Sequence, residues 1–150
     1  MRVVIVGAGR VGTSLARALR GTRHPVELFP ARRFVAAGRL RAALLVLAVR
    51  DADLARWAAR LAAAGALTRR TAVVHLAGSL GPEVLAPLRP VTAGVGQAHP
   101  VASFPSLGAP IDLAGATLAV SGDPVAVRRA GVLARAIGMA PRAIAPRDRA

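Results

Sequence analysis

A glycine-rich turn joins an apolar run to an amphipathic stretch near the start of the chain. Val3 to Val6 are all apolar, which is typical of a strand covered on both faces. Gly7-Ala8-Gly9-Arg10-Val11-Gly12 follows directly. From Arg10 to Arg20 apolar residues recur at helical spacing, and Gly21 ends the pattern. The sequence therefore predicts a buried strand, a tight turn and a helix, in that order.

The same alternation continues through the 150 residues, a length that suits a single domain. Strand-length apolar runs alternate with helix-length stretches, which predicts an α/β fold with a mainly parallel sheet. Further strands are predicted at 26–29, 44–49, 72–76, 91–96, 117–120 and 143–145, and further helices from Asp51 or Asp53 to Ala64, from Pro82, and from Asp123 to Ile137. The Pro- and Gly-rich stretch from Gly96 to Pro110 is predicted to be a long irregular loop.

The glycine spacing has a specific physical interpretation. Gly7 allows a tight turn, Gly9 lets the backbone approach a pyrophosphate, and Gly12 permits close helix packing. The N-terminus of the following helix offers N–H donors and positive potential. The segment from Gly7 to Gly12, including Arg10 and Val11, is thus a candidate dinucleotide loop; the alternative is a strand-to-helix turn that holds no ligand.

The end of the second strand indicates which dinucleotide would bind. An NAD-binding chain presents an acidic residue there to the ribose 2′-hydroxyl. Here Pro30 occupies the tip, Glu27 lies within the strand, and Arg32 and Arg33 follow. Guanidinium groups at that point can hold the 2′-phosphate of NADP, so NADP is preferred over NAD. The alternative is that both arginines belong to a solvated loop.

Candidate reaction residues follow the third, fourth and fifth strands, because ligands lie beyond the carboxyl ends of an open parallel sheet. Ala48, Val49 and Arg50 are predicted to border the nicotinamide side of the cofactor. Ser79 could bind a carboxamide or substrate oxygen, or it could simply approach a helix as a cap. His99, predicted in a loop at this edge, is either a general acid or carboxylate ligand, or an imidazole that anchors the loop.

Other polar and aromatic residues are expected to be structural. His75 falls inside the fourth strand and His24 precedes the second, so both are predicted to be structural or exposed. Trp57 is predicted to pack in the core.

The absent residue types exclude several chemistries. The chain has no Cys, no Tyr and no Lys, which removes thiolate nucleophiles, Schiff bases, P-loops and cysteine zinc sites. Its three histidines lack metal-ligand spacing, so no metal site is expected.

The charge is strongly positive, with 21 basic residues against 7 acidic ones, but the arginines are scattered and aromatics make up only 3%. Nucleic-acid binding is therefore not favoured, whereas attraction to anionic ligands is. The apolar stretch near the N-terminus is far shorter than the about 18 to 20 residues of a membrane span, so a cytoplasmic location without membrane association is expected.

Five segments together resemble a known family: RVVIVGAGRVGTSLARAL, LLVLAVRDADL, VVHLAGSLGPEVLAPL, GQAHPVASFPS and GDPVAVRRAGVLARAIG. In this order they look like Rossmann-like proteins that pair an N-terminal NADP-binding domain with a C-terminal helical domain of unknown function. The likeness extends more distantly to pyrroline-5-carboxylate reductase, ketopantoate reductase and, through His99-Pro100, prephenate dehydrogenase.

The resemblance implies a doubly wound, Rossmann-type, three-layer αβα fold over residues 1–150. It implies that Gly7 to Gly12 bind the cofactor and that Ser79 and His99 face the reaction centre. In the family, a segment like Pro146 to Ala150 leads into the helical domain, which closes the site and builds the dimer. The expectation is that this helical domain is absent here. The chain is then a fragment, a truncated gene product, or a freestanding nucleotide domain that needs a partner, either in a homodimer or as a separate helical domain.

Two functions remain open at this stage. The leading one is an NADP-dependent oxidoreductase, or its cofactor-binding half, that transfers hydride to a small carbonyl or imine substrate. The alternative is a non-catalytic dinucleotide-binding sensor or regulatory subunit. Fold class alone separates neither from the other.

Overall fold

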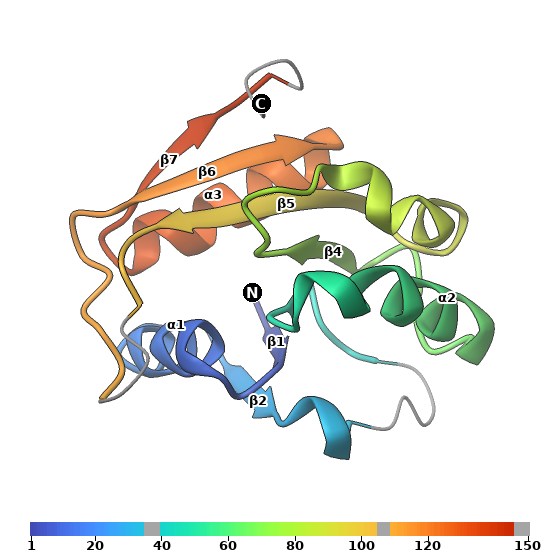
Figure 1. Cartoon of the computed structure of the whole chain (residues 1–150), viewed down its shortest axis with the longest axis horizontal. Coiled ribbons are helices and arrows are strands. Elements are labelled where there is room, and N and C mark those ends of the chain that lie inside the picture. Colours follow the sequence, from blue (N-terminus) through green and yellow to red (C-terminus); the bar gives the residue numbers. More distant parts are fainter. Residues whose placement is uncertain (35–39, 105–108, 146–150) are drawn as a thin grey trace.

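The computed structural model describes residues 1–34, 40–104 and 109–145, which form one twisted seven-stranded sheet between helices (Figure 1). The strands lie in the order β2-β1-β3-β4-β5-β6-β7. Their bounds are β1 Val3–Val6, β2 Val26–Phe29, β3 Leu44–Leu47, β4 Ala72–His75, β5 Gly94–Val101, β6 Thr117–Gly122 and β7 Ala140–Ala143. The helices are α1 Arg10–Arg20, α2 Leu54–Ala64 and α3 Pro124–Ala136, with the 3-10 helices η1 Ala31–Arg33, η2 Asp51–Asp53 and η3 Pro82–Val91.

The strand order reverses direction between β1 and β3. From β1 the chain moves outward to β2 and then crosses back to β3 on the other side of β1. Neighbouring strands are parallel from β2 through β5, and β6 and β7 are also parallel to each other. Such a switch point leaves a crevice at the carboxyl ends of the two strands, which is where ligands bind in open α/β sheets.

Each face of the sheet carries its own apolar core. In β1, Val3 and Ile5 face the layer formed by α1 and α3, whereas Val4 and Val6 face α2 and η3. All four side chains are buried, as the run of apolar residues predicted. The fold is therefore a three-layer α/β arrangement, and the prediction of a mainly parallel, doubly wound sheet is confirmed (Figure 1).

Most predicted elements occur close to their predicted bounds. β1, α1 and β2 match, while β3 and β4 end two residues and one residue early. Gly65 ends α2 with a φ of +65°, a left-handed conformation that suits glycine. Asp53 is the N-cap residue of α2, but its side chain makes no capping hydrogen bond. Its carboxylate instead pairs with Arg50 and Arg56.

Three predictions about the second half of the chain need correction. The helix from Pro82 is a 3-10 helix, because Pro87 and Pro90 within it lack the N–H that an α-helix requires. β5 does not end at residue 96 but continues to Val101, since antiparallel β6 pairs with it from Gly96 onward. Much of the predicted 96–110 loop is thus strand, and residues 105–108 of it lie outside the described residues. β7 begins at Ala140, three residues before the predicted strand.

Within the described ranges, no helix combines the length and apolar character that a membrane-crossing segment needs. The segment 146–150, which the family resemblance linked to a helical domain, lies outside the described residues.

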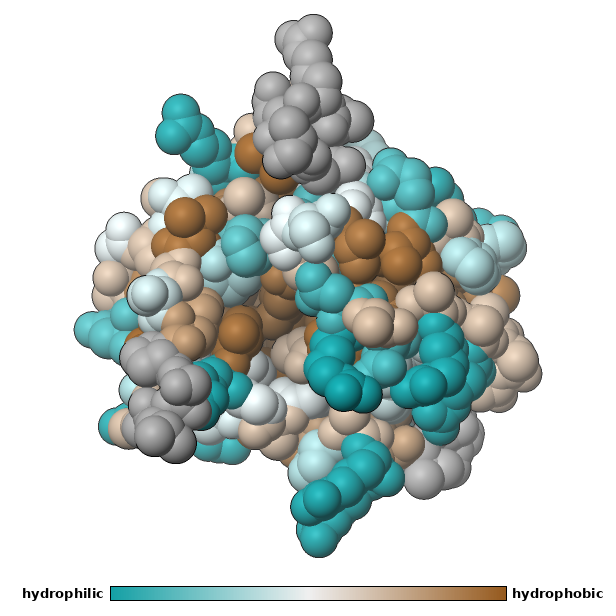
Figure 2. All heavy atoms as spheres, viewed as in Figure 1, coloured by the Kyte–Doolittle hydropathy of each residue, from teal (hydrophilic) through white to brown (hydrophobic). Residues whose placement is uncertain are grey.

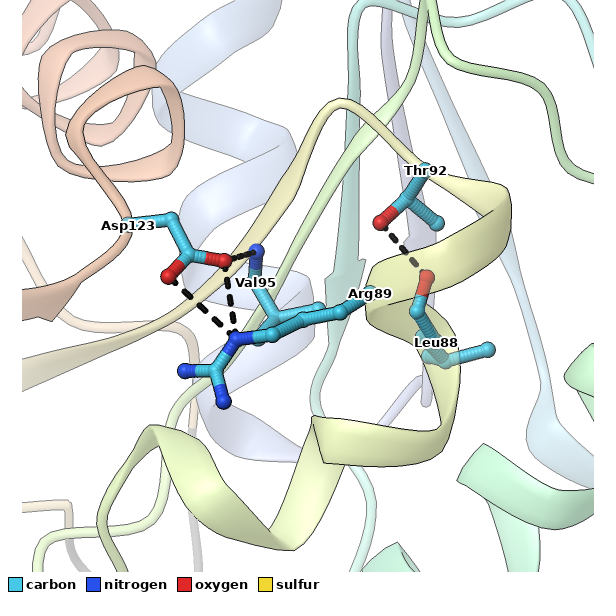
Figure 3. A network of polar contacts seen from close by, with 5 residues as sticks. All are labelled: Leu88, Arg89, Thr92, Val95 and Asp123. Atoms are coloured by element: carbon cyan, nitrogen blue, oxygen red, sulfur yellow. Dashed lines mark hydrogen bonds and ion pairs between the residues drawn. The ribbon is translucent and has the colours of Figure 1, made fainter.

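A carboxylate joins the antiparallel part of the sheet to α3 and η3. Asp123, just before α3, accepts hydrogen bonds from the Val95 backbone N–H at 2.9 Å and from Arg89 Nε at 3.2 Å (Figure 3). Nearby, the Thr92 hydroxyl donates to the Leu88 carbonyl at 2.8 Å and closes the end of η3. These contacts hold η3, β5 and the start of α3 at one point.

Replacing Asp123 should therefore destabilise the fold. We expect Asp123→Ala to lower the free energy of unfolding by about 1–3 kcal/mol, because the Val95 N–H loses its acceptor. Asp123→Asn keeps an oxygen at this position and should lower the free energy of unfolding by less than Asp123→Ala does. Arg89→Gln removes only an exposed ion pair and should lower the free energy of unfolding by less than about 1 kcal/mol. Urea denaturation measures all three. Equal losses for the Ala and Asn variants would contradict this account.

Candidate functional site

The glycine loop after β1 packs directly against the end of β3. Gly7 has a φ of +117°, and a Cβ on it would collide with the Ala48 carbonyl. A Cβ on Gly12 would collide with the Gly7 carbonyl oxygen and lie 3.2 Å from the Ala48 Cβ. Gly9 differs, because no atom lies within 4 Å of the place its Cβ would take. Two glycines thus permit the turn, and the third leaves its outer face open.

The start of α1 presents uncompensated donors beside that open face. Gly9 is the N-cap residue of α1, and no acidic residue occurs in the first turn of the helix. The loop is closed from within, since the Thr13 backbone N–H donates to the Gly9 carbonyl at 2.9 Å and its hydroxyl donates to the Ala8 carbonyl at 3.1 Å. The positive end of the helix dipole and the first N–H groups therefore remain available to an anion.

Arg10, the first residue of α1, adds a second indication of a ligand. Its Nε atom is buried and has no hydrogen-bond partner among the described residues. Buried polar atoms normally find a partner, and one that does not calls for an explanation such as a bound group. A phosphate in front of Gly9 would supply the acceptor, so the residues present fit the pyrophosphate of a dinucleotide. Val11, next in the loop, is half-buried against the core.

The tip of β2 carries the two arginines that were predicted to select NADP. Pro30 follows β2 and precedes η1, on which Arg32 and Arg33 are exposed. Phe34 then anchors this turn, with its ring 5.5 Å from that of Phe29 and 6.0 Å from that of Trp57. In Figure 2, hydrophilic side chains project at the bottom of the molecule, over this region. The turn is thus held by aromatic packing while its cations face solvent.

Glu27 does not compete for the ribose position. Its carboxylate pairs with the Arg2 guanidinium at the opposite end of β1 and β2, within the strand as predicted. Trp57 is 5% exposed, which confirms its predicted core position. His24 is also buried, where its Nδ1 lies 2.7 Å from the terminal amine of Met1.

At the carboxyl end of β3, Ala48, Val49 and Arg50 lead into η2. Ala48 forms the floor against the glycine loop, and Val49 is half-buried. The Arg50 side chain is 84% exposed and its Nε lies 3.0 Å from an oxygen of Asp53. The residues next to the glycine loop are therefore small or apolar, and the guanidinium of Arg50 is exposed to solvent.

The segment after β4 turns back over β5. His75 is fully buried; its Nε2 lies 2.9 Å from the Gly81 carbonyl, and its Nδ1 accepts from the Ala77 backbone N–H at 3.1 Å. This imidazole is structural, as predicted. Ser79 is exposed, and its hydroxyl donates to a carboxylate oxygen of Asp51 at 3.2 Å. Ser79 therefore does not cap η3, and its contact reaches across to the end of β3.

His99 lies within strand β5 and not in a loop, contrary to the prediction. The reason is the pairing of His99 with Ala119 of antiparallel β6. Parallel β4 has already ended opposite Gln97, so His99 still lies beyond the carboxyl edge of the parallel strands. Its Nδ1 is 2.9 Å from the Leu76 carbonyl, and its ring packs so closely under Gly78 that a Cβ there would come within 2.8 Å. The half-buried imidazole thus anchors the segment that carries Ser79.

The sequence analysis assigned no specific role to Gln97, which directly follows the fifth predicted strand. This residue is 1% exposed; its amide donates to the Ala77 carbonyl at 2.7 Å, and its oxygen accepts from the Ser121 hydroxyl at 3.1 Å. Gln97 thereby fixes the segment from Ala77 to Ser79 from below. An amide side chain in an otherwise small and apolar buried run was the available signal.

The structure brings these groups to one face of the molecule. Figure 2 shows that face hollowed near its centre, with hydrophobic side chains inside the hollow and both hydrophobic and hydrophilic side chains around it. In the same view, α1 and α2 flank this hollow and the end of β1 points toward it (Figure 1). The glycine loop joins the end of β3 through Ala48, and the end of β3 joins Ser79 through Asp51. Arg32 and Arg33 stand apart, beyond the tip of β2.

Comparison with known proteins agrees with this geometry. A family model described as a Rossmann-like domain matches residues 30–100, from the end of β2 almost to the end of β5. The chain has a Rossmann-like fold. Comparison with curated protein sequences gave no match.

Solved structures share this Rossmann-like fold at low sequence identity. A prephenate dehydrogenase from A. aeolicus, in complex with hydroxyphenyl propionate and NAD+, superimposes with a TM-score of 0.74 at 15% identity, covering 99% of this chain and 61% of its own. A semialdehyde dehydrogenase NAD-binding protein from Cupriavidus necator superimposes with a TM-score of 0.64 at 18% sequence identity, covering 95% of this chain and 62% of its own. An imine reductase variant from Myxococcus stipitatus, in complex with NAD+, superimposes with a TM-score of 0.68 at 16% sequence identity, covering 95% of this chain and 54% of its own. The chain spans no more than about three fifths of these proteins.

The glycine geometry predicts that two similar substitutions act differently. Gly12→Ala should lower the free energy of unfolding by about 1–3 kcal/mol, because its Cβ meets backbone that cannot move freely. Gly9→Ala should cost less than about 1 kcal/mol while weakening dinucleotide binding, since its Cβ takes space on the open face. Thermal unfolding and calorimetric titration separate the two effects. If Gly9→Ala binds the dinucleotide as tightly as the unchanged protein, the ligand does not bind at the open face of Gly9.

Proposed function

We propose that residues 1–150 form the dinucleotide-binding part of an oxidoreductase, with NADP preferred over NAD, that transfers hydride to a small carbonyl or imine substrate. The observation that carries the proposal is the open face at Gly9 beside the buried, unpartnered Nε of Arg10. Both lie at the N-terminus of α1, at the switch point of the sheet. Structural neighbours described as NAD+ complexes support dinucleotide binding.

Each segment would contribute a separate part of cofactor binding. Gly7 to Gly12, with Arg10, would hold the pyrophosphate by backbone N–H groups and the guanidinium. Arg32 and Arg33 would hold the 2′-phosphate, because a guanidinium matches a phosphate with paired hydrogen bonds. Ala48, Val49 and Arg50 would border the nicotinamide half of the molecule. When bound, reduced NADP supplies a hydride, and the chain supplies position and charge.

Two residues would act at the reacting end of the crevice. A ring nitrogen that faces a carbonyl oxygen carries a proton, so Nδ1 of His99 donates to the Leu76 carbonyl, and its Nε2 would be the atom that exchanges a proton with a substrate. In the reducing direction a protonated Nε2 would donate to the carbonyl oxygen or imine nitrogen. The Ser79 hydroxyl would orient the substrate oxygen or the carboxamide, with Asp51 holding its position. The exposed Arg50 suits a substrate carboxylate.

Cofactor choice can be tested by titrating the protein with NADPH and NADH. Trp57 fluorescence provides a signal, because its ring contacts Phe34 directly after Arg32 and Arg33. We expect NADPH to bind more tightly, and the double variant Arg32→Gln, Arg33→Gln to weaken NADPH binding about tenfold while leaving NADH unchanged.

The matched control is Arg17→Gln with Arg20→Gln, which removes the same charge from the exposed side of α1. If both double variants weaken NADPH binding equally, the effect comes from net charge alone, and the proposed role of η1 is overturned. Absence of binding to either nucleotide would overturn the proposed function as a whole.

The role of His99 requires a separate measurement. With NADPH and a set of 2-oxo acids and carboxylate-bearing imines, the full chain or its assembly should oxidise NADPH with at least one of them. His99→Gln should then lower kcat by about a hundredfold or more with little change in NADPH affinity. Tight NADPH binding with no turnover by any preparation would favour the alternative, a non-catalytic dinucleotide sensor.

A further inference from the structure

A second basic groove lies at the opposite edge of the sheet from the glycine loop. Its volume is about 880 Å³, and it opens at the amino ends of β1, β3 and β4. The proposed dinucleotide crevice lies at the carboxyl ends of these parallel strands, so the groove is a separate site. Its lining consists of Arg2, Leu40, Arg41, Ala42, Ala43, Thr68, Arg69, Arg70 and Thr71.

The charge in this groove is only partly compensated. Of its four arginines, Arg2 is paired with Glu27, outside the lining. Arg41, Arg69 and Arg70 are exposed, and the structure shows no ion pair to any of the three among the described residues. No carboxylate lines the groove in the described part of the chain. Positive potential therefore concentrates between two loops.

Hydrogen bonds hold those two loops in a fixed relation. The Thr71 hydroxyl, which is buried, donates to the Ala42 carbonyl at 2.6 Å, and the Ala72 N–H donates to the Ala43 carbonyl at 3.0 Å. Arg129 reaches across from α3, and its Nη1 lies 2.6 Å from the Ala43 carbonyl and 2.7 Å from the Arg70 carbonyl. Both walls are thus tied together from behind, which keeps the cations of the two loops facing the same space.

The geometry points to a binding site for a small anion with two or more phosphate groups. Guanidinium groups pair with phosphate oxygens through two hydrogen bonds each, and three such groups exceed what one monovalent anion would neutralise. The volume lies in the range of small-molecule sites. The lining contains no aromatic residue on which a base could stack, which disfavours single-stranded nucleic acid.

Calorimetric titration of the full chain with inorganic tripolyphosphate tests this site. The titration is carried out both with and without NADPH, so that binding at the other edge of the sheet can be told apart from binding in the groove. We expect saturable binding that weakens about tenfold or more in the double variant Arg69→Gln, Arg70→Gln. The double variant Arg17→Gln, Arg20→Gln, with the same net charge, should bind within about twofold of the unchanged protein. A parallel titration with ATP shows whether a nucleoside adds affinity to the phosphate chain.

Three results would overturn the proposal. One is absence of saturable tripolyphosphate binding at physiological salt, and another is equal weakening by the two double variants, which would indicate net charge alone. The third is a short single-stranded DNA that binds through Arg69 and Arg70 while tripolyphosphate does not. Circular dichroism checks that the groove variant is folded, which we expect because Arg70 is held only through its backbone: its N–H donates to the Thr68 hydroxyl in the same loop, and its carbonyl accepts from Arg129.

Discussion

The close approach of the glycine loop to the end of β3 is the contact on which the site depends. Gly7 and Gly12 leave no room for a Cβ because the Ala48 backbone and the turn itself occupy that space. This contact sets the height of α1 above the sheet and aims its N-terminus into the crevice at the switch point between β1 and β3. Without it, Gly9 and Arg10, with which α1 begins, would not be held against the end of β3.

The antiparallel pair of β5 and β6 supplies the other half of the site. Because β6 continues the hydrogen bonding of β5 after β4 has ended, Gln97 and His99 are held on a strand and not on a loop. Both side chains bind carbonyl oxygens of the segment from Leu76 to Gly78. Asp123 secures the start of this pair through the Val95 N–H. A rigid strand therefore positions a short irregular segment at the carboxyl edge of the parallel strands.

Positive charge is arranged differently at the two edges of the sheet. At the carboxyl edge, arginines stand at the ends of the crevice, and Arg50 and Arg56 share Asp53. At the amino edge, three arginines face one groove whose lining has no carboxylate in the described part of the chain. The formal charge of +14 thus acts locally, because salt screens the electrostatic potential of each arginine cluster beyond about 8–10 Å.

The sequence determined the local architecture. Hydrophobic periodicity predicted β1, α1 and β2 at their observed bounds, because each is a short-range pattern that requires no partner to be recognised. It also located the glycine loop, and Arg32 and Arg33 just past the tip of β2. Only the tertiary structure decided where β5 ends, which carbonyls His99 and Gln97 bind, and that Ser79 contacts Asp51. These depend on strand pairing and on contacts between residues far apart in the chain, and neither is encoded in local spacing.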